Sequence, residues 1–184
     1  MDSPRSQVTA FPFPPFRTDG QKGVTAMRPI SFSCTENLPL APEEIAGQIL
    51  NLANWTDFKG YGILPGIKAA EFEIRTPDVI GSRIRVMNTD GSTHVEEIIE
   101  WRPDHHLRLD LKEFSPPLSH LATGFTEWWE FERIGGSTRV TRSFELHAQS
   151  VLTRPLLWQI SFLLKRAIAR HLSEMREAPT YRGN

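Results

Sequence analysis

The stretch Thr153–Arg176, TRPLLWQISFLLKRAIARHLSEMR, decides the fold because it predicts one long amphipathic helix. At about 100° per residue, one stripe of this helix is apolar. Thr153 is a candidate N-cap, and Pro155 falls in the first turn, where a missing N–H costs least. Such a helix is stabilised mainly by packing, so the upstream chain should supply a concave apolar surface. The stripe contains Leu156, Leu157, Ile160, Leu163, Leu164, Ala167, Ile168 and Met175.

The chain before this helix predicts a sheet of antiparallel strands. An alternating stretch from Pro29 to Leu38 gives a first strand. Short connections between the later strands favour antiparallel neighbours. These six strands are predicted at 67–75, 81–88, 93–102, 106–114, 123–133 and 137–148.

Two short helices are predicted between the first and second strands. Pro42 at a helix start, with Glu43 and Glu44 in the first turn, predicts an amphipathic helix. The segment Asn54–Phe58, which contains Trp55, predicts a second helical piece.

Three hairpins predict the strand register, because loop length fixes which residues pair. A two-residue Asp90–Gly91 loop pairs Val86 with Val95 and Ile84 with Glu97. A loop over residues 103–105 pairs Trp101 with Leu107, Ile99 with Leu109 and Glu97 with Leu111. A Gly135–Gly136 loop pairs Phe131 with Val140, Trp129 with Arg142, Glu127 with Phe144 and Phe125 with Leu146.

These registers gather apolar partners on one face, which we expect to hold the long helix. The opposite face should be solvated. We expect it to carry Arg85, Glu96, Glu100, Arg108, Asp110, Lys112, Glu130, Glu132, Arg139 and Thr141.

Composition limits the possible functions. The 184 residues, 39% hydrophobic and 23% charged, fit one globular domain with tails. A net charge of −1 gives no broad field that attracts nucleic acid. The lone Cys34 excludes an intramolecular disulfide and favours a reducing compartment, so we expect a cytoplasmic protein. No apolar run approaches the roughly 20 residues of a membrane span, so we expect no integral membrane segment.

The chain divides into three parts. Residues 1–27 are rich in proline, show no helical or strand period and predict a flexible tail, with Phe11, Phe13 and Phe16 as its apolar exceptions. Residues 28–178 form the predicted domain. Residues 179–184 form a short C-terminal tail.

The order of elements resembles the START-related helix-grip superfamily, and within it the polyketide cyclase/dehydrase and lipid-transfer branch. The resemblance covers about residues 28–177 and rests on this order, on the NLANW segment with Trp55, on the APEEI helix start and on the hairpin GGSTRVTRSFEL. It implies an α+β helix-grip fold, in which a curved seven-stranded antiparallel sheet wraps around the long C-terminal helix. It also implies an elongated cavity for an apolar or amphipathic small molecule. Members include lipid and hormone carriers, aromatic polyketide cyclases and hydrolase activators.

Four ionisable residues are predicted on the inner face: Glu97, Glu113, Glu127 and Arg142. An isolated buried charge is costly, so each must be paired, solvated or neutralised. Glu127 and Arg142 are near enough to pair, and Trp129 opposite Arg142 offers a cation–π surface. The pair could be purely structural, contact a ligand or transfer protons.

The inward registers also predict a cavity wall, although the same positions are consistent with packed core. With the polar pair included, the predicted wall consists of Trp55, Phe58, Ile63, Phe72, Val95, Ile99, Trp101, Leu109, Leu111, Phe125, Glu127, Trp129, Arg142, Phe144, Ile160 and Leu164.

No catalytic signature stands out. The weak candidates for acid–base chemistry are Glu127, Arg142, Glu113 and His106. No metal-ligand spacing is present, so we expect neither a metal nor a cofactor.

Three functions remain open. The first is binding of a hydrophobic or amphipathic small molecule, lipid-like or polyketide-like, and the second is an enzyme of cyclase or aromatase type that uses the same cavity. The third is a protein-interaction module. Trp158 and Phe162 point away from the predicted sheet, so a homodimer or tail contact through these rings is possible.

Overall fold

Seven antiparallel strands form one curved sheet in the computed structural model, which describes residues 27–177. The strand order across the sheet is β1-β7-β6-β5-β4-β3-β2. The predicted N-terminal tail, apart from Met27, lies outside the described residues, and so does the predicted C-terminal tail, residues 179–184. The strands are β1 Ile30–Leu38, β2 Ile67–Ile74, β3 Arg83–Asn88, β4 Thr93–Arg102, β5 His106–Lys112, β6 Ala122–Ile134 and β7 Ser137–Ala148.

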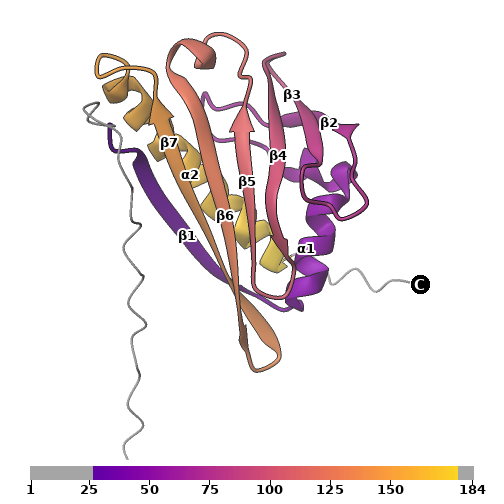
Figure 1. Cartoon of the computed structure of the whole chain (residues 1–184). Helices are drawn as coiled ribbons and strands as arrows, with labels where there is room; N and C mark the ends of the chain where they lie inside the picture. Colours follow the sequence, from indigo (N-terminus) through magenta and orange to yellow (C-terminus); the bar gives the residue numbers. More distant parts are fainter. Residues whose placement is uncertain (1–26, 178–184) are drawn as a thin grey trace, which may run out of the picture.

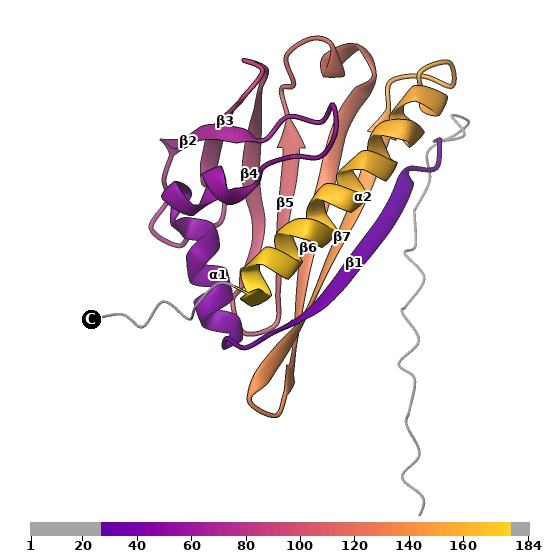
Figure 2. The same ribbon diagram turned by 180° about the vertical axis from the view of Figure 1, so that it is seen from behind.

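Two α-helices and two 3-10 helices complete the described chain: α1 Pro42–Leu50, η1 Leu52–Asp57, η2 Leu118–His120 and α2 Arg154–Glu177. Figures 1 and 2 show α2 crossing one side of the sheet, and α1 lies close to the C-terminal end of α2. This is the predicted α+β helix-grip arrangement.

Most of the predicted stripe of α2 packs inward. Leu157, Leu164, Ala167 and Ile168 are buried, and Ile160 and Met175 pack against the core. Leu156 is 49% exposed, however, and Ser161 and Leu172 occupy the inner face in addition. The prediction missed Ser161 because this residue is polar, and it included Leu156 because apolar residues extend around more of the helix than the face that packs. The predicted N-cap bond of Thr153 is not formed within the described residues, because its hydroxyl oxygen accepts from the amide of Ser150 at 3.1 Å and not from a helix amide.

The β6–β7 hairpin has the predicted register. Phe131 pairs with Val140, Trp129 with Arg142, Glu127 with Phe144 and Phe125 with Leu146. Gly135 has a φ of +58°, a conformation that glycine adopts without steric cost, and it makes the tight turn.

The predicted β3–β4 register is wrong by one residue. Arg85 pairs with Val95 and Ile84 with Glu96. The turn is a three-residue loop over 89–91, in which the amide of Asn88 donates to the carbonyl of Ser92 at 2.8 Å. Gly91, at a φ of +87°, takes the left-handed position that closes such a loop.

The β4–β5 register is correct only near the turn. Trp101 pairs with Leu107, but a bulge between Ile98 and Glu100 makes Ile98, not Ile99, the partner of Leu109. The same shift pairs Glu96, not Glu97, with Leu111. A one-residue slip reverses the facing of every side chain beyond it, so Glu96 lies on the inner face and not on the outer one.

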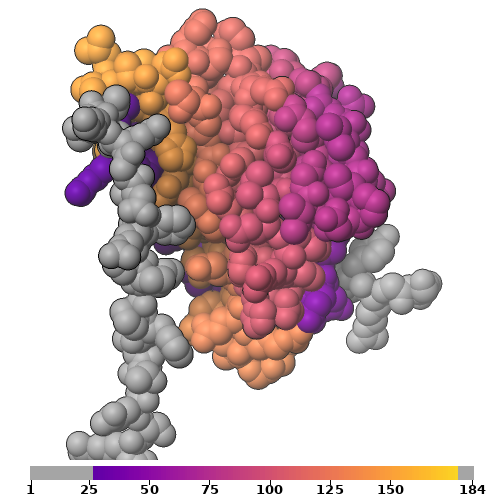
Figure 3. All heavy atoms as spheres, in the orientation of Figure 1, coloured from indigo at the N-terminus to yellow at the C-terminus, as the bar shows by residue number. Residues whose placement is uncertain are grey.

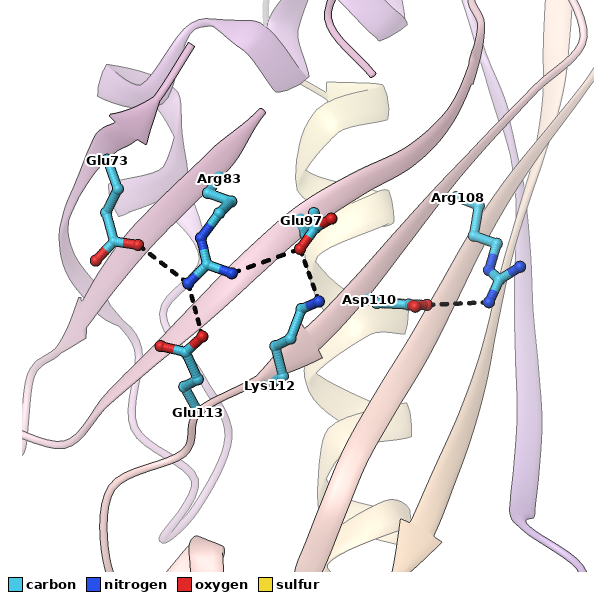
Figure 4. Close-up of polar contacts among 7 residues, drawn as sticks. All are labelled: Glu73, Arg83, Glu97, Arg108, Asp110, Lys112 and Glu113. Carbon is cyan, nitrogen blue, oxygen red and sulfur yellow. Dashed lines mark hydrogen bonds and ion pairs between the residues drawn. The ribbon is translucent and has the colours of Figure 1, made fainter. Parts of the chain in front are cut away.

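The outer face is a charged surface. Figure 3 shows it from the side of Figure 1, where atoms of the strands form most of the view. Arg83 lies 2.6 Å from Glu113 and 3.5 Å from Glu97, and Lys112 lies 2.7 Å from Glu97 (Figure 4). Glu97 and Glu113 therefore belong to this ionic network and do not point inward as predicted.

Candidate functional site

The segment after β1 forms one wall of the site. Pro42 starts α1, and the side chain of Glu44 accepts a hydrogen bond from the amide of Ala41 at 2.7 Å, so the helix start is capped. The indole Nε1 of Trp55 donates to the carbonyl of Ile49 at 2.8 Å. This bond satisfies an otherwise open carbonyl at the end of α1 and fixes η1 against it.

A tight loop after η1 ties this wall to α2. Gly60 has a φ of +68°, and a Cβ there would lie 2.1 Å from the carbonyl oxygen of Leu64, so only glycine fits. The carbonyl of Gly60 accepts a hydrogen bond from the Nη2 of Arg170 at 2.8 Å.

A cavity of about 1050 Å³ lies between this wall, the sheet and the C-terminal part of α2. We call it the inner cavity. Its apolar lining comes from α1, η1 and the strands, with Ile45, Ile49, Trp55 and Leu109 as examples. Its volume lies just above the range of roughly 300–1,000 Å³ that is common for small-molecule sites.

Four polar side chains line the inner cavity between the sheet and α2: Glu96, Glu127, Arg142 and His171, which we call the polar cluster. Arg142 donates from Nε to Oε1 of Glu127 at 2.7 Å, and its Nη2 lies 2.5 Å from the same oxygen. The two side chains are only 8% and 5% exposed. The guanidinium carbon of Arg142 lies 4.0 Å from the ring centroid of Trp129, so the predicted cation–π contact is present.

His171 and Glu96 complete the cluster. The Nη1 of Arg142 lies 3.2 Å from Nδ1 of His171, so Nδ1 accepts and the imidazole proton sits on Nε2. Oε1 of Glu96 lies 3.1 Å from Nε2 of His94. Both contacts join two protein side chains and involve no ligand.

Burial controls protonation in this cluster. Desolvation raises the pKa of Glu127 to about 7, although the charge of Arg142 opposes the shift. Desolvation and the charge of Arg142 together lower the pKa of His171 to about 3, so its imidazole is neutral at physiological pH. At neutral pH, Arg142 therefore contacts a carboxyl group close to its own pKa and a neutral imidazole ring.

Six of the predicted wall residues line the inner cavity: Trp55, Phe58, Leu109, Glu127, Trp129 and Arg142. Others pack in or against the core: Trp101, Leu111, Phe125, Phe144, Ile160 and Leu164. Phe72 lines a separate pocket of about 330 Å³ near the β2–β3 loop.

The remaining predicted wall residues lie elsewhere. Ile63 is 89% exposed, in the loop after η1. Val95 is buried, but it pairs with Arg85 and Lys112 on the outer side of the sheet. Ile99 sits at the bulge of β4, which removes it from the inner register.

Two of the weak catalytic candidates are also on the outer side. Glu113 is held by Arg83 in the network of Figure 4. His106 lies 3.0 Å from Glu100 and is separated from the inner cavity by the sheet. Of the catalytic candidates, only Glu127 and Arg142 line the inner cavity.

His171 and Glu96 were missed from the sequence. A signal for His171 existed, because it lies three residues after Ile168 and so near the same helix face. Glu96 had no such signal, since its facing depends on the β4 bulge and on the loop length after β3.

Trp158 and Phe162 are 62% and 50% exposed on the side of α2 away from the sheet, as predicted. The guanidinium carbon of Arg166 lies 4.7 Å from the ring centroid of Phe162. Among residues 27–177, no helix is long and apolar enough to cross a membrane.

Several solved structures share this arrangement of sheet and helix. A START superfamily protein from Mycobacterium smegmatis matches with a TM-score of 0.62 at 13% identity, covering 80% of this chain and 97% of that one. The protein TTHA0849 from Thermus thermophilus matches with a TM-score of 0.60 at 16% identity, over 80% and 95%. Ginseng major latex-like protein 151 from Panax ginseng matches with 0.56 at 15% identity, over 79% and 98%. The fold is START-like.

The family follows from the sequence itself. A family model described as polyketide cyclase / dehydrase and lipid transport matches residues 29–178, and the chain belongs to this family. A comparison with curated proteins found no match.

Proposed function

We propose that this protein binds a hydrophobic or amphipathic small molecule, lipid-like or polyketide-like, in the inner cavity. One observation carries the proposal: a cavity of about 1050 Å³, with apolar side chains from α1, η1 and the sheet in its lining, also contains a hydrogen-bonded polar cluster. An apolar pocket with a few placed polar groups is the usual form of a small-molecule site. Family membership agrees with it, since lipid transport is part of the family's description.

The setting of this function is proposed to be the cytoplasm. Support comes from the single cysteine, Cys34, which is buried in the core and forms no disulfide.

Gly47 offers a direct test, because it lines the inner cavity and a Cβ there meets nothing within 4 Å. Gly47→Phe should place a ring in the cavity mouth and abolish retention of apolar molecules, measured by native mass spectrometry of the purified protein. Gly47→Ala is the matched control, since it adds only a methyl group and raises helix propensity by roughly 1 kcal/mol. Equal retention by both variants would show that ligands bind elsewhere.

A cyclase-type enzyme is the second candidate, and Glu127 favours it. A buried carboxyl with a pKa of about 7 beside a cavity is suited to exchange protons near neutral pH. Glu127→Gln should then abolish turnover of a polyketide chain while ligand retention persists. Retention without any turnover in the wild-type protein would leave binding as the function.

The third candidate is an interaction module that uses Trp158 and Phe162. Its support is their exposure on one helix face, and a homodimer through these rings is the form it would take.

A further inference from the structure

The charges around the inner cavity restrict the ligands it can accept. Its lining contains five carboxylates against two cations. Lys59 is one cation, and its Nζ lies 2.6 Å from the carbonyl of Thr56. Arg142 is the other. The carboxylates belong to Glu44, Asp57, Glu96, Glu127 and Glu174.

The cation inside the cavity is already engaged. Arg142 uses Nε and Nη2 on Glu127 and Nη1 on His171. An anionic ligand group would compete with Glu127 for Arg142 and would lie beside the carboxylate of Glu96, which lines the same cavity. His171 adds no positive charge, because its imidazole is neutral.

Hydrogen-bonding capacity remains on the imidazole and the two carboxyl groups of the polar cluster. Nε2–H of His171, Oε2 of Glu96 and Oε2 of Glu127 make no hydrogen bond within residues 27–177, and none of the three atoms is fully buried. The imidazole N–H donates, and the carboxylate oxygens accept. A hydroxyl group can satisfy the donor and one acceptor, an amine satisfies an acceptor, and a carboxylate faces like charge at Glu96.

We infer that the ligand presents to the polar cluster an uncharged or cationic group that donates a hydrogen bond, an alcohol, phenol or amine, and that the inner cavity rejects anionic amphiphiles such as fatty acids. This rests on the proposed function, because it specifies the ligand of the same site.

The test compares three probes that share one ten-carbon tail: decylamine, 1-decanol and decanoate. Binding to the full chain is measured at neutral pH by displacement of a neutral fluorophore, N-phenyl-1-naphthylamine. Decylamine should bind most tightly and decanoate at least about tenfold more weakly than decanol, which is about 1.4 kcal/mol. The difference in affinity between decanol and decanoate should become smaller at high salt, because salt screens the exposed carboxylates that line the cavity.

Charge variants at the cavity mouth give a second arm. Glu44→Gln/Asp57→Asn/Glu174→Gln removes three exposed lining charges, and glutamine at 44 retains an acceptor for the amide of Ala41. Decanoate should then bind nearly as well as decanol. A matched control, Glu71→Gln/Asp78→Asn/Glu130→Gln, changes the net charge by the same amount at exposed positions outside the lining. It should leave the ratio of decanol affinity to decanoate affinity unchanged.

Each outcome decides the matter. Decanoate binding as tightly as decanol to the wild-type protein overturns this inference but leaves the proposed function standing. Failure of all three probes, together with no molecule retained by the wild-type protein, overturns both. An equal shift in the mouth variant and its control overturns the role given to the lining.

Discussion

At the scale of single residues, Glu127 and His171 respond to burial in opposite ways. The folded protein keeps a proton on Glu127, whose pKa is about 7, that the unfolded chain releases above its ordinary value of 4.5. Stability from this residue is therefore lost as pH rises from 4.5 to 7. His171 stays neutral down to a pKa of about 3, while the unfolded chain takes up a proton below 6.5. Its contribution is lost as pH falls from 6.5 to 3.

The two effects oppose each other where they overlap, between the ordinary pKa values of 4.5 and 6.5. Removing one group should expose the other. In His171→Gln, the free energy of unfolding should fall with rising pH in this window more steeply than in the wild-type protein, by up to about 1.4 kcal/mol per pH unit. In Glu127→Gln, it should instead rise more steeply.

Urea unfolding at several pH values across this window measures both slopes. His105→Gln is the control, because His105 is an exposed histidine in the β4–β5 turn with a side chain 72% accessible. Parallel pH profiles for the three variants would contradict the assigned protonation states.

At the scale of elements, the packed face of α2 decides which leucines stabilise the fold. Leu172 is 1% exposed in the core, whereas Leu156 is 49% exposed near the start of the helix. Leu172→Ala should lower the free energy of unfolding by about 2–5 kcal/mol, because it leaves a cavity between helix and sheet. Leu156→Ala, the same chemical change, should cost within about 0.5 kcal/mol. Chemical denaturation of both variants makes the comparison. A larger loss for Leu156→Ala than for Leu172→Ala would mean that the helix packs on the stripe predicted from the sequence.

The elements were predictable from the sequence because each depends on local chemistry. The β6–β7 register followed from Gly135–Gly136, and the start of α1 from Pro42 and two acidic residues. The face of the sheet on which each β4 side chain lies was not predictable. It depends on a three-residue loop in place of a two-residue one and on a bulge at Ile99, in a run of residues with no glycine to mark it.

These two register errors changed the predicted site more than the predicted fold. They moved Glu97 and Val95 to the outer side and brought Glu96 into the polar cluster. Glu127, Arg142 and Trp129 were placed correctly because they lie on the hairpin with the unambiguous turn. The cavity itself depends on how α1, η1 and α2 pack together, which no local pattern specifies.

At the scale of the whole molecule, one side of α2 packs on the sheet and the other presents large rings to solvent. Trp158 and Phe162 lie four residues apart on that outer side, which Figure 2 shows facing away from the sheet. Arg28 lies beside the start of α2, where its carbonyl accepts a hydrogen bond from Arg154. Two exposed rings on one helix face are typical of an interaction surface.

We therefore predict that the protein self-associates through this face. Trp158→Ser/Phe162→Ser should shift the solution mass, measured by sedimentation or light scattering, from dimer to monomer. The free energy of unfolding at low protein concentration should be nearly unchanged, because neither ring contributes to the core. The control is Ile74→Ser/Ile80→Ser, since these residues are 50% and 46% exposed at the end of β2 and in the following loop. The control variant should keep the solution mass of the wild-type protein. If the wild-type protein is monomeric at every concentration, the predicted dimer does not form.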